Sequence, residues 1–494
     1  MSIHRLASFV VVIALAWGLV AVGGGAVRAG GGIWSYPTDC ALVQDCINAA
    51  GPGDTVYMYA DATGQSISIS KSVSVKSGDA IRHVVTSVSY GDLSTPVIST
   101  IAGLDVTLTV GVFLDSSTGS SIIIRNVVVH GQAGQTAAIR MTIETSASVT
   151  VENSSGTGLG NNGGGIAILA SPEGGNASFR LIGNRFSGHG NTQSGIGISL
   201  FLQSSGTVTA DIYNNVIWDF GRSGQGAASG IAILPSGTVH ADVNLVGNTV
   251  ERSGVDGLQQ RNSLATGGQL ALDMFNNTFS HAAAFGVRLT PGLAGTLAFR
   301  AGFNNYFANA LGNGFAGLPK GPGNLAVDPK FVDRANGNLK LTSTSGLLNK
   351  GQVCSPGGVA NPEAANRHRV SGASVDIGAY ERGAGTINGV VILGTNATNS
   401  QNGSPGADIL CGYGGADTQN GMGGNDFMDG GDAGDFQVGG GGADRMLGGL
   451  GNDTLCANDG KGIDFLNGGK GDDGFRADSG DTRTSVEHPS PCAP

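Results

Sequence analysis

Aromatic and charged residues are scarce in this chain, making up 6% and 13% of its 494 residues. The 27 lysines and arginines form no cluster, so the sequence offers no basic surface of the kind that binds nucleic acid. After the N-terminal region, no apolar run is long enough to cross a bilayer. We therefore expect a mature chain with no membrane span and no nucleic-acid partner. The apolar residues, 40% of the total, still suffice for a sizeable core.

Glycine, by contrast, is abundant, with 86 residues. Together with the scarcity of aromatic and charged residues, this bias favours a repetitive, turn-rich β architecture or a low-complexity segment. The formal charge of −10 is concentrated near the C-terminus, where residues 402–478 contain thirteen aspartates, no glutamate and four basic residues. Such a stretch is either a disordered linker or a structure that needs more than apolar side chains to hold it.

The first residues have the layout of a secretory signal peptide. Arg5 precedes a long apolar run, and small residues follow up to Ala29. We expect cleavage after Ala29 and a secreted or cell-surface protein, although an uncleaved membrane anchor would have a similar apolar run.

The six cysteines of an exported chain can oxidise. Cys40 with Cys46, and Cys456 with Cys492, are the most favourable pairs by their closeness in the sequence. The connectivity cannot be deduced from the sequence alone.

An asparagine recurs at intervals of 27 to 33 residues through the middle of the chain. The positions are Asn126, Asn153, Asn184, Asn215, Asn248, Asn277 and Asn305. The residue two before is apolar in every case, and the residue two after is apolar in six of the seven. Asparagine tolerates the left-handed backbone of a tight corner, and its amide can bond to the equivalent asparagine one coil along. The pattern therefore predicts corners that stack from coil to coil.

A glycine followed by alternating apolar residues marks a strand after each long turn, as at Gly165-Ile166 and Gly286-Val287. Each period then holds three short strands, which predicts a right-handed parallel β-helix. A sandwich of hairpin strands would not keep asparagine at one corner in seven successive units. Residues 41–50 have helical apolar spacing and are followed by Gly51-Pro52-Gly53, so we expect a helix that closes the first coil.

This helix is similar to the capping helix of many pectin-lyase-like β-helix proteins. Residues 326–351 and 374–383 resemble the terminal coils of exported members that end in variable surface anchors. Those members have a Ser-Pro-Ala-Ile-Asp-like stretch before the glycine, whereas this chain has Ser-Gly-Leu-Leu-Asn at 345–349. The resemblance covers about residues 36–383. It implies a fold but no activity, because this fold hosts lyases, hydrolases, epimerases and adhesins.

Catalysis by the β-helix finds little support in the residues expected along its outer groove. The outward positions are predicted to be Ala167, Gly197, Ala232, Gln259, Arg288, Leu169, Ser199, Leu234, Arg261 and Thr290. None is a carboxylate, whereas a hydrolase needs two. Arg261 and Arg288 fall on adjacent coils and are the best candidates for a lyase or uronate-binding site. Two solvated arginines are the simpler interpretation.

Aspartate recurs every nine residues near the C-terminus. The positions are Asp408, Asp417, Asp426, Asp435, Asp444 and Asp453, followed after a two-residue insertion at Ala457-Asn458 by Asp464 and Asp473. The frame around them is Gly-Gly-x-Gly-x-Asp-x-apolar-x, as in residues 448–456. Eight units in one frame resemble the calcium-binding nonapeptide repeats of the RTX, or haemolysin-type, family.

This resemblance implies a parallel β-roll in which each nonapeptide gives a six-residue turn and a three-residue strand. Ca²⁺ needs six or more oxygens, so each ion would lie between turns two repeats apart. The predicted pairs are Asp408–Asp426, Asp417–Asp435, Asp426–Asp444 and Asp435–Asp453. Without the ion the carboxylates repel one another, and the glycine-rich chain cannot offset its ordering entropy. We expect this segment to fold only with Ca²⁺ bound.

Departures from the repeat predict local weaknesses. Gln419 and Gln437 occupy inward positions on one side and should thin the core there. Ala433 replaces a turn glycine, and the insertion should disturb sites that join Asp444 or Asp453 to later repeats. Cys411 and Cys456 fall on opposite sides of a regular roll, which excludes a disulfide between them.

The sequence thus predicts an all-β protein: a right-handed parallel β-helix with an N-terminal capping helix, followed by a calcium-binding parallel β-roll. The predicted segments are a signal peptide (1–29), the β-helix (30–325), its terminal coils (326–383), a linker (384–401), the roll (402–482) and a tail (483–494). We predict a secreted calcium-binding protein whose β-helix contacts a glycan or the cell envelope without catalysis. The alternative is a lyase or epimerase acting on an acidic polysaccharide such as pectate or alginate.

Overall fold

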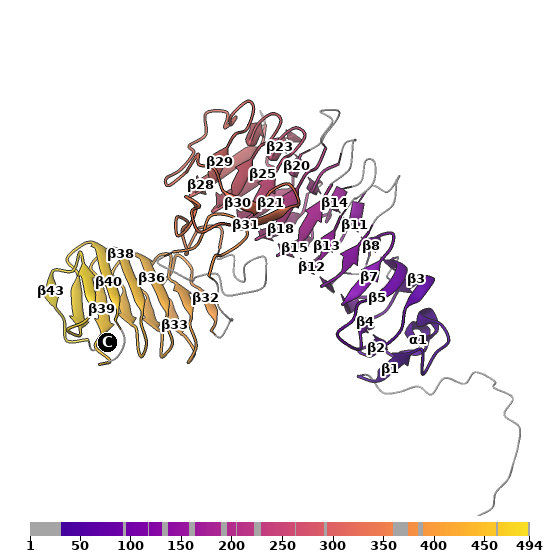
Figure 1. The fold of residues 1–494 in the computed structure, drawn as a ribbon, viewed down its shortest axis with the longest axis horizontal. Coiled ribbons are helices and arrows are strands. Elements are labelled where there is room, and N and C mark those ends of the chain that lie inside the picture. Colours follow the sequence, from indigo (N-terminus) through magenta and orange to yellow (C-terminus); the bar gives the residue numbers. More distant parts are fainter. Residues whose placement is uncertain are drawn as a thin grey trace, which may run out of the picture.

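Two successive stacks of parallel strands make up the described chain (Figure 1). The structure is a computed structural model that describes residues 31–492 except 92–94, 117, 131–136, 158–163, 189–194, 204, 222–228, 262, 291–293, 359–373, 384–388 and 461–462. The predicted signal peptide lies outside these residues. The described chain is all-β apart from the helix α1 (Val43–Ala49), as the sequence predicts.

The N-terminal stack is a parallel β-helix with three faces. One face is a sheet of eleven strands. Its members are β1 (Ile33–Tyr36), β2 (Thr55–Met58), β4 (Ser74–Ser77), β6 (Ile98–Ala102), β9 (Ser120–Arg125), β12 (Ala147–Glu152), β15 (Asn176–Ile182), β18 (Thr207–Tyr213), β21 (His240–Val246), β25 (Gln269–Phe275) and β28 (Thr296–Gly302). Each strand pairs in parallel with the equivalent strand of the next coil.

The other two faces are two columns of strands that both pair with β5. One column contains β3 (Ala62–Ile69), β5 (His83–Tyr90), β8 (Val110–Leu114), β11 (Ala137–Ile143), β14 (Gly164–Ala170), β17 (Ile198–Leu202), β20 (Ile231–Gly237), β23 (Leu258–Arg261) and β27 (Val287–Thr290), with β24 (Ser263–Leu264) paired to the end of β20. The other contains β7 (Leu104–Val106), β10 (Val128–Val129), β13 (Ser155–Gly156), β16 (Arg185–Ser187), β19 (Val216–Trp218), β22 (Thr249–Glu251), β26 (Thr278–Ser280) and β29 (Asn305–Phe307). Each central coil therefore contributes three strands, as the period predicts.

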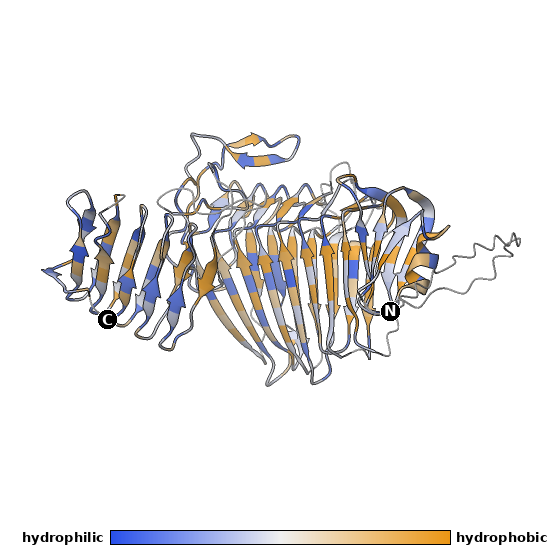
Figure 2. Cartoon of the chain, turned by 90° about the horizontal axis from the view of Figure 1, so that it is seen from below, coloured by the Kyte–Doolittle hydropathy of each residue, from blue (hydrophilic) through white to orange (hydrophobic). Residues whose placement is uncertain are grey.

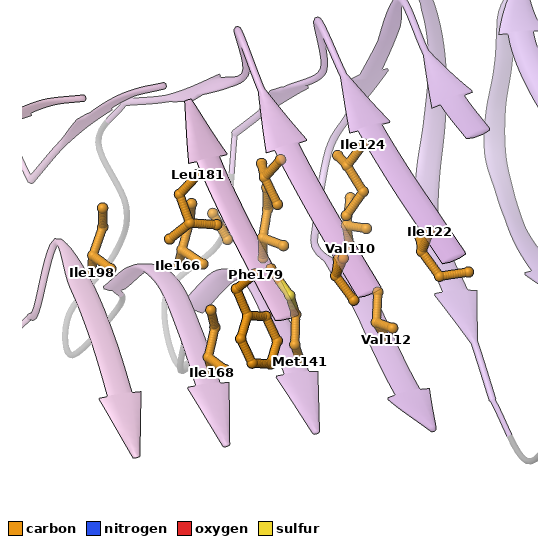
Figure 3. Close-up of a cluster of buried hydrophobic side chains, with 14 of the residues drawn as sticks. Val110, Val112, Ile122, Ile124, Met141, Ile166, Ile168, Phe179, Leu181 and Ile198 are labelled. Atoms are coloured by element: carbon orange, nitrogen blue, oxygen red, sulfur yellow. The ribbon is translucent and has the colours of Figure 1, made fainter. Parts of the chain in front are cut away.

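Inward side chains of successive coils form one continuous core. Strand residues alternate between buried and outward, as in the pattern of β12, because side chains of a strand point to opposite faces in turn. Figure 3 shows one section in which Ile166, Ile168 and Ile198 stack beside Phe179 and Leu181 from the facing sheet. The apolar colour follows the strands along the whole β-helix in Figure 2. At the N-terminal end, α1 buries Val43, Cys46 and Ile47 against this core.

A ladder of buried amides runs along one corner of the β-helix. The Oδ1 atom of Asn215 accepts hydrogen bonds from the backbone N–H and the Nδ2 of Asn184, at 3.1 and 3.0 Å. The same pair of bonds joins the later rungs. The ladder comprises Asn184, Asn215, Asn248, Asn277 and Asn304, with Ser154 donating to its first rung and Asn324 accepting at its last.

The predicted stacking is confirmed for Asn184, Asn215, Asn248 and Asn277 and is wrong for Asn126, Asn153 and Asn305. The left-handed conformation belongs to the residue just before each rung. Asn126 and Asn153 occupy that position, with φ of 52° and 49°. Asn305 comes one residue after the rung and starts β29.

Residues 326–383, here called the return segment, were predicted to form terminal coils. In the described part of this segment, strands β30 (Phe331–Asp333) and β31 (Asn338–Leu341) instead pair with each other antiparallel. The segment folds back along the outside of earlier coils, where Leu339, Ala379 and Tyr380 pack against Val216 and Trp218. It is also held by polar contacts, since Ala379 donates its N–H to Thr249 Oγ1 at 2.9 Å and Tyr213 donates its hydroxyl to the carbonyl of Gly357 at 2.8 Å.

The C-terminal stack has two sheets of six short parallel strands. One contains β32 (Val391–Leu393), β34 (Ile409–Cys411), β36 (Phe427–Asp432), β38 (Arg445–Leu450), β40 (Phe465–Lys470) and β42 (Thr482–Thr484). The other contains β33 (Ser400–Asn402), β35 (Thr418–Asn420), β37 (Phe436–Val438), β39 (Thr454–Ala457), β41 (Gly474–Ala477) and β43 (His488–Pro489). The roll therefore starts within the predicted linker and ends within the predicted tail.

Three disulfides fasten the chain. Cys40–Cys46 and Cys456–Cys492 are the two pairs that sequence proximity favoured. The third bond, Cys354–Cys411, joins the return segment to the roll. The excluded pair, Cys411 with Cys456, does not form. The junction also buries Val353 and Val375 against Ile409 and Phe427.

Candidate metal centre

The turns of the roll repeat one backbone conformation. In the six turns that end at Asp417, Asp426, Asp435, Asp444, Asp453 and Asp473, the second and fourth positions have positive φ, which glycine adopts without a steric cost. Gly440 and Gly442 of the turn 439–444 have φ of 92° and 150°. Three other residues take this conformation in place of glycine: Tyr413 at 70°, Met422 at 71° and Ala433 at 81°. The glycine pattern of the repeat is therefore a requirement of the turn itself.

The eight aspartates predicted as ligands stand in two ladders, one on each side of the roll. All are between 0 and 3% exposed. In each ladder the Oδ1 atom of one aspartate accepts the backbone N–H of the aspartate two repeats earlier. Asp426 accepts from Asp408 at 2.8 Å, and Asp435 accepts from Asp417 at 2.7 Å. The two remaining predicted pairs, 426–444 and 435–453, are joined in the same way.

The ladders continue across the two-residue insertion. The N–H of Asp444 donates to Asp464 Oδ1 at 2.7 Å, and that of Asp453 donates to Asp473 Oδ1 at 2.8 Å. The insertion leaves these carboxylate hydrogen bonds in place, because strands β38 and β40 keep their register. The expectation that it disturbs the cation sites there stays a prediction.

In seven of the eight aspartates the other carboxylate oxygen, Oδ2, has no hydrogen-bond partner. The Oδ2 atoms of Asp417, Asp426, Asp435, Asp444, Asp453, Asp464 and Asp473 are buried and have no hydrogen-bond partner. Burial raises the pKa of Asp426 to about 8 and that of Asp435 to about 7, and the like charges of neighbouring aspartates add to both shifts. A buried carboxylate oxygen without a partner is costly, so these atoms are where a cation would be stabilised.

Backbone oxygens face the same positions. At Gly421, the first residue of a turn, an added Cβ would overlap both Asp426 Oδ2 and the carbonyl oxygen of Gly439 in the next turn on that side. The equivalent overlap of a carboxylate and a carbonyl oxygen occurs at Gly403, Gly412, Gly430, Gly448 and Gly468. The first glycine of the turn is thus required by space, because a side chain would fill the cradle between these oxygens.

The donor set fits a hard cation such as Ca²⁺, which takes six to eight oxygen ligands from carboxylates and carbonyls. Among the described residues, no three acidic, histidine or cysteine side chains gather closely enough to hold a metal by themselves. The carbonyl oxygens would therefore have to supply the remaining ligands, together with the aspartate of each turn.

Two further acidic residues continue the ladders beyond the repeats. Asp481 Oδ1 accepts the N–H of Asp464 at 2.9 Å, and Glu487 Oε2 accepts the N–H of Asp473 at 2.8 Å. At the other end, Asn399 donates its N–H to Asp417 Oδ1 at 2.6 Å. These turns could not be recognised from the sequence, since none has the Gly-Gly-x-Gly-x-Asp frame.

The glutamines that were expected to thin the core form a buried ladder instead. Gln419 donates to Gln401 Oε1, and Gln437 donates to Gln419 Oε1, both at 2.7 Å. Each also donates to a carbonyl of the facing sheet, as Gln437 does to Leu447 at 2.9 Å. Polar side chains are accepted here because their amides are hydrogen-bonded. The ladder ends at Gln437, whose Oε1 is buried without a partner.

The two arginines proposed on the β-helix do not share a row. Arg288 lies opposite Gln259, whereas Arg261 lies opposite Thr290. The charge of Arg288 is matched by the fully buried Asp256, which accepts its Nε–H at 2.8 Å. Asp256 was missed because it lies in the turn before the strand. The predicted outward row was also shifted by two residues in one coil, because Ala167 pairs with Ser199 and not with Gly197.

No protein-family model matches the chain. A search of curated proteins also gave no match. The resemblances to pectin-lyase-like and RTX proteins therefore rest on the residues alone. Among the described residues, no helix has the length and apolar character to span a membrane.

Proposed function

We propose that this is a secreted calcium-binding protein whose roll folds around Ca²⁺ and whose β-helix is a rigid, non-catalytic surface for contact with a glycan or the cell envelope. The observation that carries the calcium proposal is the row of buried, unpartnered Oδ2 atoms beside carbonyl oxygens. When bound, Ca²⁺ would neutralise the negative charge of the buried carboxylates. The aspartates and the carbonyls of the turns would hold it.

Adding Ca²⁺ to chelator-treated full-length protein tests this proposal. We expect a gain of β signal in circular dichroism and of protection against hydrogen exchange over residues 391–489, because ordering of the turns requires the cation. If the chelator-treated protein is already ordered there and Ca²⁺ adds nothing, the proposal is wrong.

A paired substitution tests the ligands. Asp426 and Asp444 are each shared between two predicted sites, so Asp426→Asn with Asp444→Asn should lower the number of bound calcium ions in equilibrium dialysis. Asp432→Asn is the matched control, because Asp432 is an exposed aspartate of the same repeats that stands outside the ladders. Equal stoichiometry in both variants would refute the assignment of these ligands.

An outward row on the β-helix supports the surface role. Phe113, Thr142, Leu169, Phe201 and Leu234 lie opposite one another on five successive coils. Phe113 and Phe201 are 40 and 39% exposed. Exposed apolar rows of this kind mark interaction sites, and aromatic rings offer large flat contact areas to a partner such as a sugar ring.

Binding of the full chain to immobilised polysaccharides tests this role. Phe113→Ser with Phe201→Ser should weaken retention on a bound polysaccharide, while Ile98→Ser should not, since Ile98 is 70% exposed on a different sheet. Unchanged retention of the double variant would exclude this row as the contact surface.

Catalysis on acidic polysaccharide stays the alternative, and no contact of Arg261 or Arg288 favours it. Release of unsaturated product from pectate or alginate would establish it.

A further inference from the structure

The insertion in the roll changes one turn and leaves its strands in place. Aspartates on one side of the roll are eighteen residues apart up to Asp444, and the next one, Asp464, follows after twenty. Strand β40 nevertheless pairs with β38 in regular register, from Arg445 opposite Phe465 to Leu450 opposite Lys470. The extra residues are therefore accommodated before the start of β40, and Ala457 continues β39 opposite Ala477.

The changed turn alters which oxygen atoms lie near Asp444. At the six other first glycines described above, an added Cβ would meet both an aspartate Oδ2 and the carbonyl oxygen of the following turn. At Gly439 the three nearest atoms would all belong to Asp444. The neighbouring carbonyl oxygen is therefore farther from this cradle than at the six other turns.

A carboxylate approaches in its place. Counting back from Asp464, Asp459 occupies the position at which other turns begin with glycine. Gly460, which follows it, has the left-handed φ of 72° expected at the second position. The Oδ2 atom of Asp459 comes within 3.5 Å of where a Cβ would lie at Gly441, in the turn of Asp444.

We propose that Asp459 is a third carboxylate ligand at the cation site between Asp444 and Asp464, replacing a carbonyl that the other sites use. The Oδ2 atoms of Asp444 and Asp464 are buried without a partner, and in this structure the three carboxylates do not gather closely enough to hold a metal by themselves. Three like charges repel unless a cation lies between them, so binding would draw Asp459 toward Asp444. Because ligand charge tunes affinity for hard cations, this site takes Ca²⁺ more tightly than the two-carboxylate sites before it and prefers trivalent lanthanides.

This inference rests on the proposed calcium function, and its test uses the full-length chain. Calcium titration by calorimetry and Tb³⁺ luminescence would be compared for wild type, Asp459→Asn and Asp472→Asn. Asp472 is the matched control, because it is an exposed aspartate in the next turn whose side chain is 72% accessible. We expect Asp459→Asn to weaken one site by about tenfold or more, the loss of about 1.4 kcal/mol of binding free energy, and to reduce its preference for Tb³⁺ over Ca²⁺. Asp472→Asn should bind as wild type does.

The outcomes separate the two proposals. If wild type binds neither ion, the calcium function fails and the Asp459 inference falls with it. If wild type binds Ca²⁺ and Asp459→Asn has the same affinities and the same Tb³⁺ preference, only the role of Asp459 is refuted. Circular dichroism of the variant at saturating Ca²⁺ checks that the roll still folds.

Discussion

At the scale of single residues, glycine and aspartate meet different requirements of each turn. Glycine at the first position leaves room for oxygens, and glycine at the second and fourth positions permits positive φ. A residue with a side chain adopts that conformation at a cost of roughly 1–2 kcal/mol. Tyr413 recovers some of this cost, because its hydroxyl donates to the carbonyl of Ser355 at 3.1 Å. Ala433 has no side-chain group with which to do so.

Ala433→Gly should therefore stabilise the roll. Removing the left-handed strain at φ of 81° outweighs the extra entropy of glycine in the unfolded chain, for a net gain of about 0.5–1 kcal/mol. Urea unfolding at saturating Ca²⁺ measures it. Ala416→Gly is the control, because Ala416 is an exposed turn residue without positive φ, and it should be neutral or destabilising. Equal effects of the two substitutions would contradict the strain argument.

The asparagine corner shows what single residues can and cannot reveal. Asn184 and Asn248 could be recognised as rungs because apolar residues flank them at fixed distances. Two adjacent corner residues have different needs, however: the first needs positive φ and the second needs an amide. Asparagine suits both, so Asn126 could not be distinguished from a rung by its spacing. Only the backbone angles separate the two roles.

At the scale of elements, the rows that run along each stack decide its stability. The nine-residue period predicted the apolar column of the roll, and Leu410, Met428 and Met446, which occupy the apolar position of the frame, are fully buried. The period could not predict the first and last turns, because residues 394–399 keep only Gly394 and the turns that end at Asp481 and Glu487 lack the Gly-Gly-x-Gly frame. They complete the roll through backbone pairing and ladder bonds, which depend on position more than on side-chain type.

Asn248→Ala should destabilise the β-helix. Its Oδ1 accepts from Asn215 and its Nδ2 donates to Asn277 and to the carbonyl of Ile212, so the substitution leaves several buried groups unsatisfied. We expect a loss of about 2 kcal/mol or more and a fall of roughly 4–8 °C in the unfolding temperature. Asn244→Ala, which removes one half-buried bond to Asp211, is the control. A similar melting temperature for both variants would argue against the ladder.

The carboxylate ladders predict an unusual pH dependence for the metal-free roll. The pKa is raised to about 8 for Asp426 and to about 6 for Asp453, above the value of about 3.9 in an unfolded chain. The folded roll therefore binds more protons than the unfolded chain between about pH 4 and pH 8, and its free energy of unfolding falls as pH rises through this range. Circular dichroism of chelator-treated protein should show more β structure at pH 4–5 than at pH 8.

Saturating Ca²⁺ should reverse this trend, because protons then compete with the cation for the same oxygens. The pH series with chelator and the pH series with Ca²⁺ are recorded at the same ionic strength, which controls for general charge effects. A metal-free roll that is as ordered at pH 8 as at pH 4–5 would contradict the burial of the Oδ2 atoms.

At the scale of the whole molecule, the return segment connects the two stacks. Gln352 donates its N–H to Asn276 Oδ1 at 2.8 Å on the β-helix, and Cys354 is bonded to Cys411 of the roll. This docking could not be predicted, because the segment has no period and its contacts are with residues up to 195 positions away in the sequence. The two stacks, by contrast, were recognisable because each coil repeats its neighbour.

The connection predicts that Ca²⁺ affects the β-helix side of the junction. Hydrogen exchange of residues 351–358 should slow when Ca²⁺ is added, because an ordered roll holds them through Cys411 and Tyr413. In Cys354→Ser with Cys411→Ser this effect should shrink while the roll itself remains protected. Strand β12, which pairs with β9 and β15 inside the β-helix, is the internal control. If the protection of residues 351–358 against hydrogen exchange in wild type does not change when Ca²⁺ is added, the coupling is contradicted.

The regular pairing of the roll has a consequence for how the protein can change in length. Residues 412–429 form one eighteen-residue coil whose strands pair only with the coils before and after it. A copy of such a unit, spliced in tandem, would extend the rod by about 4.8 Å and keep the junction with the β-helix as it is. Growth or shortening by whole units is therefore open to this half of the chain, whereas the twenty-residue unit with the insertion has no interchangeable counterpart.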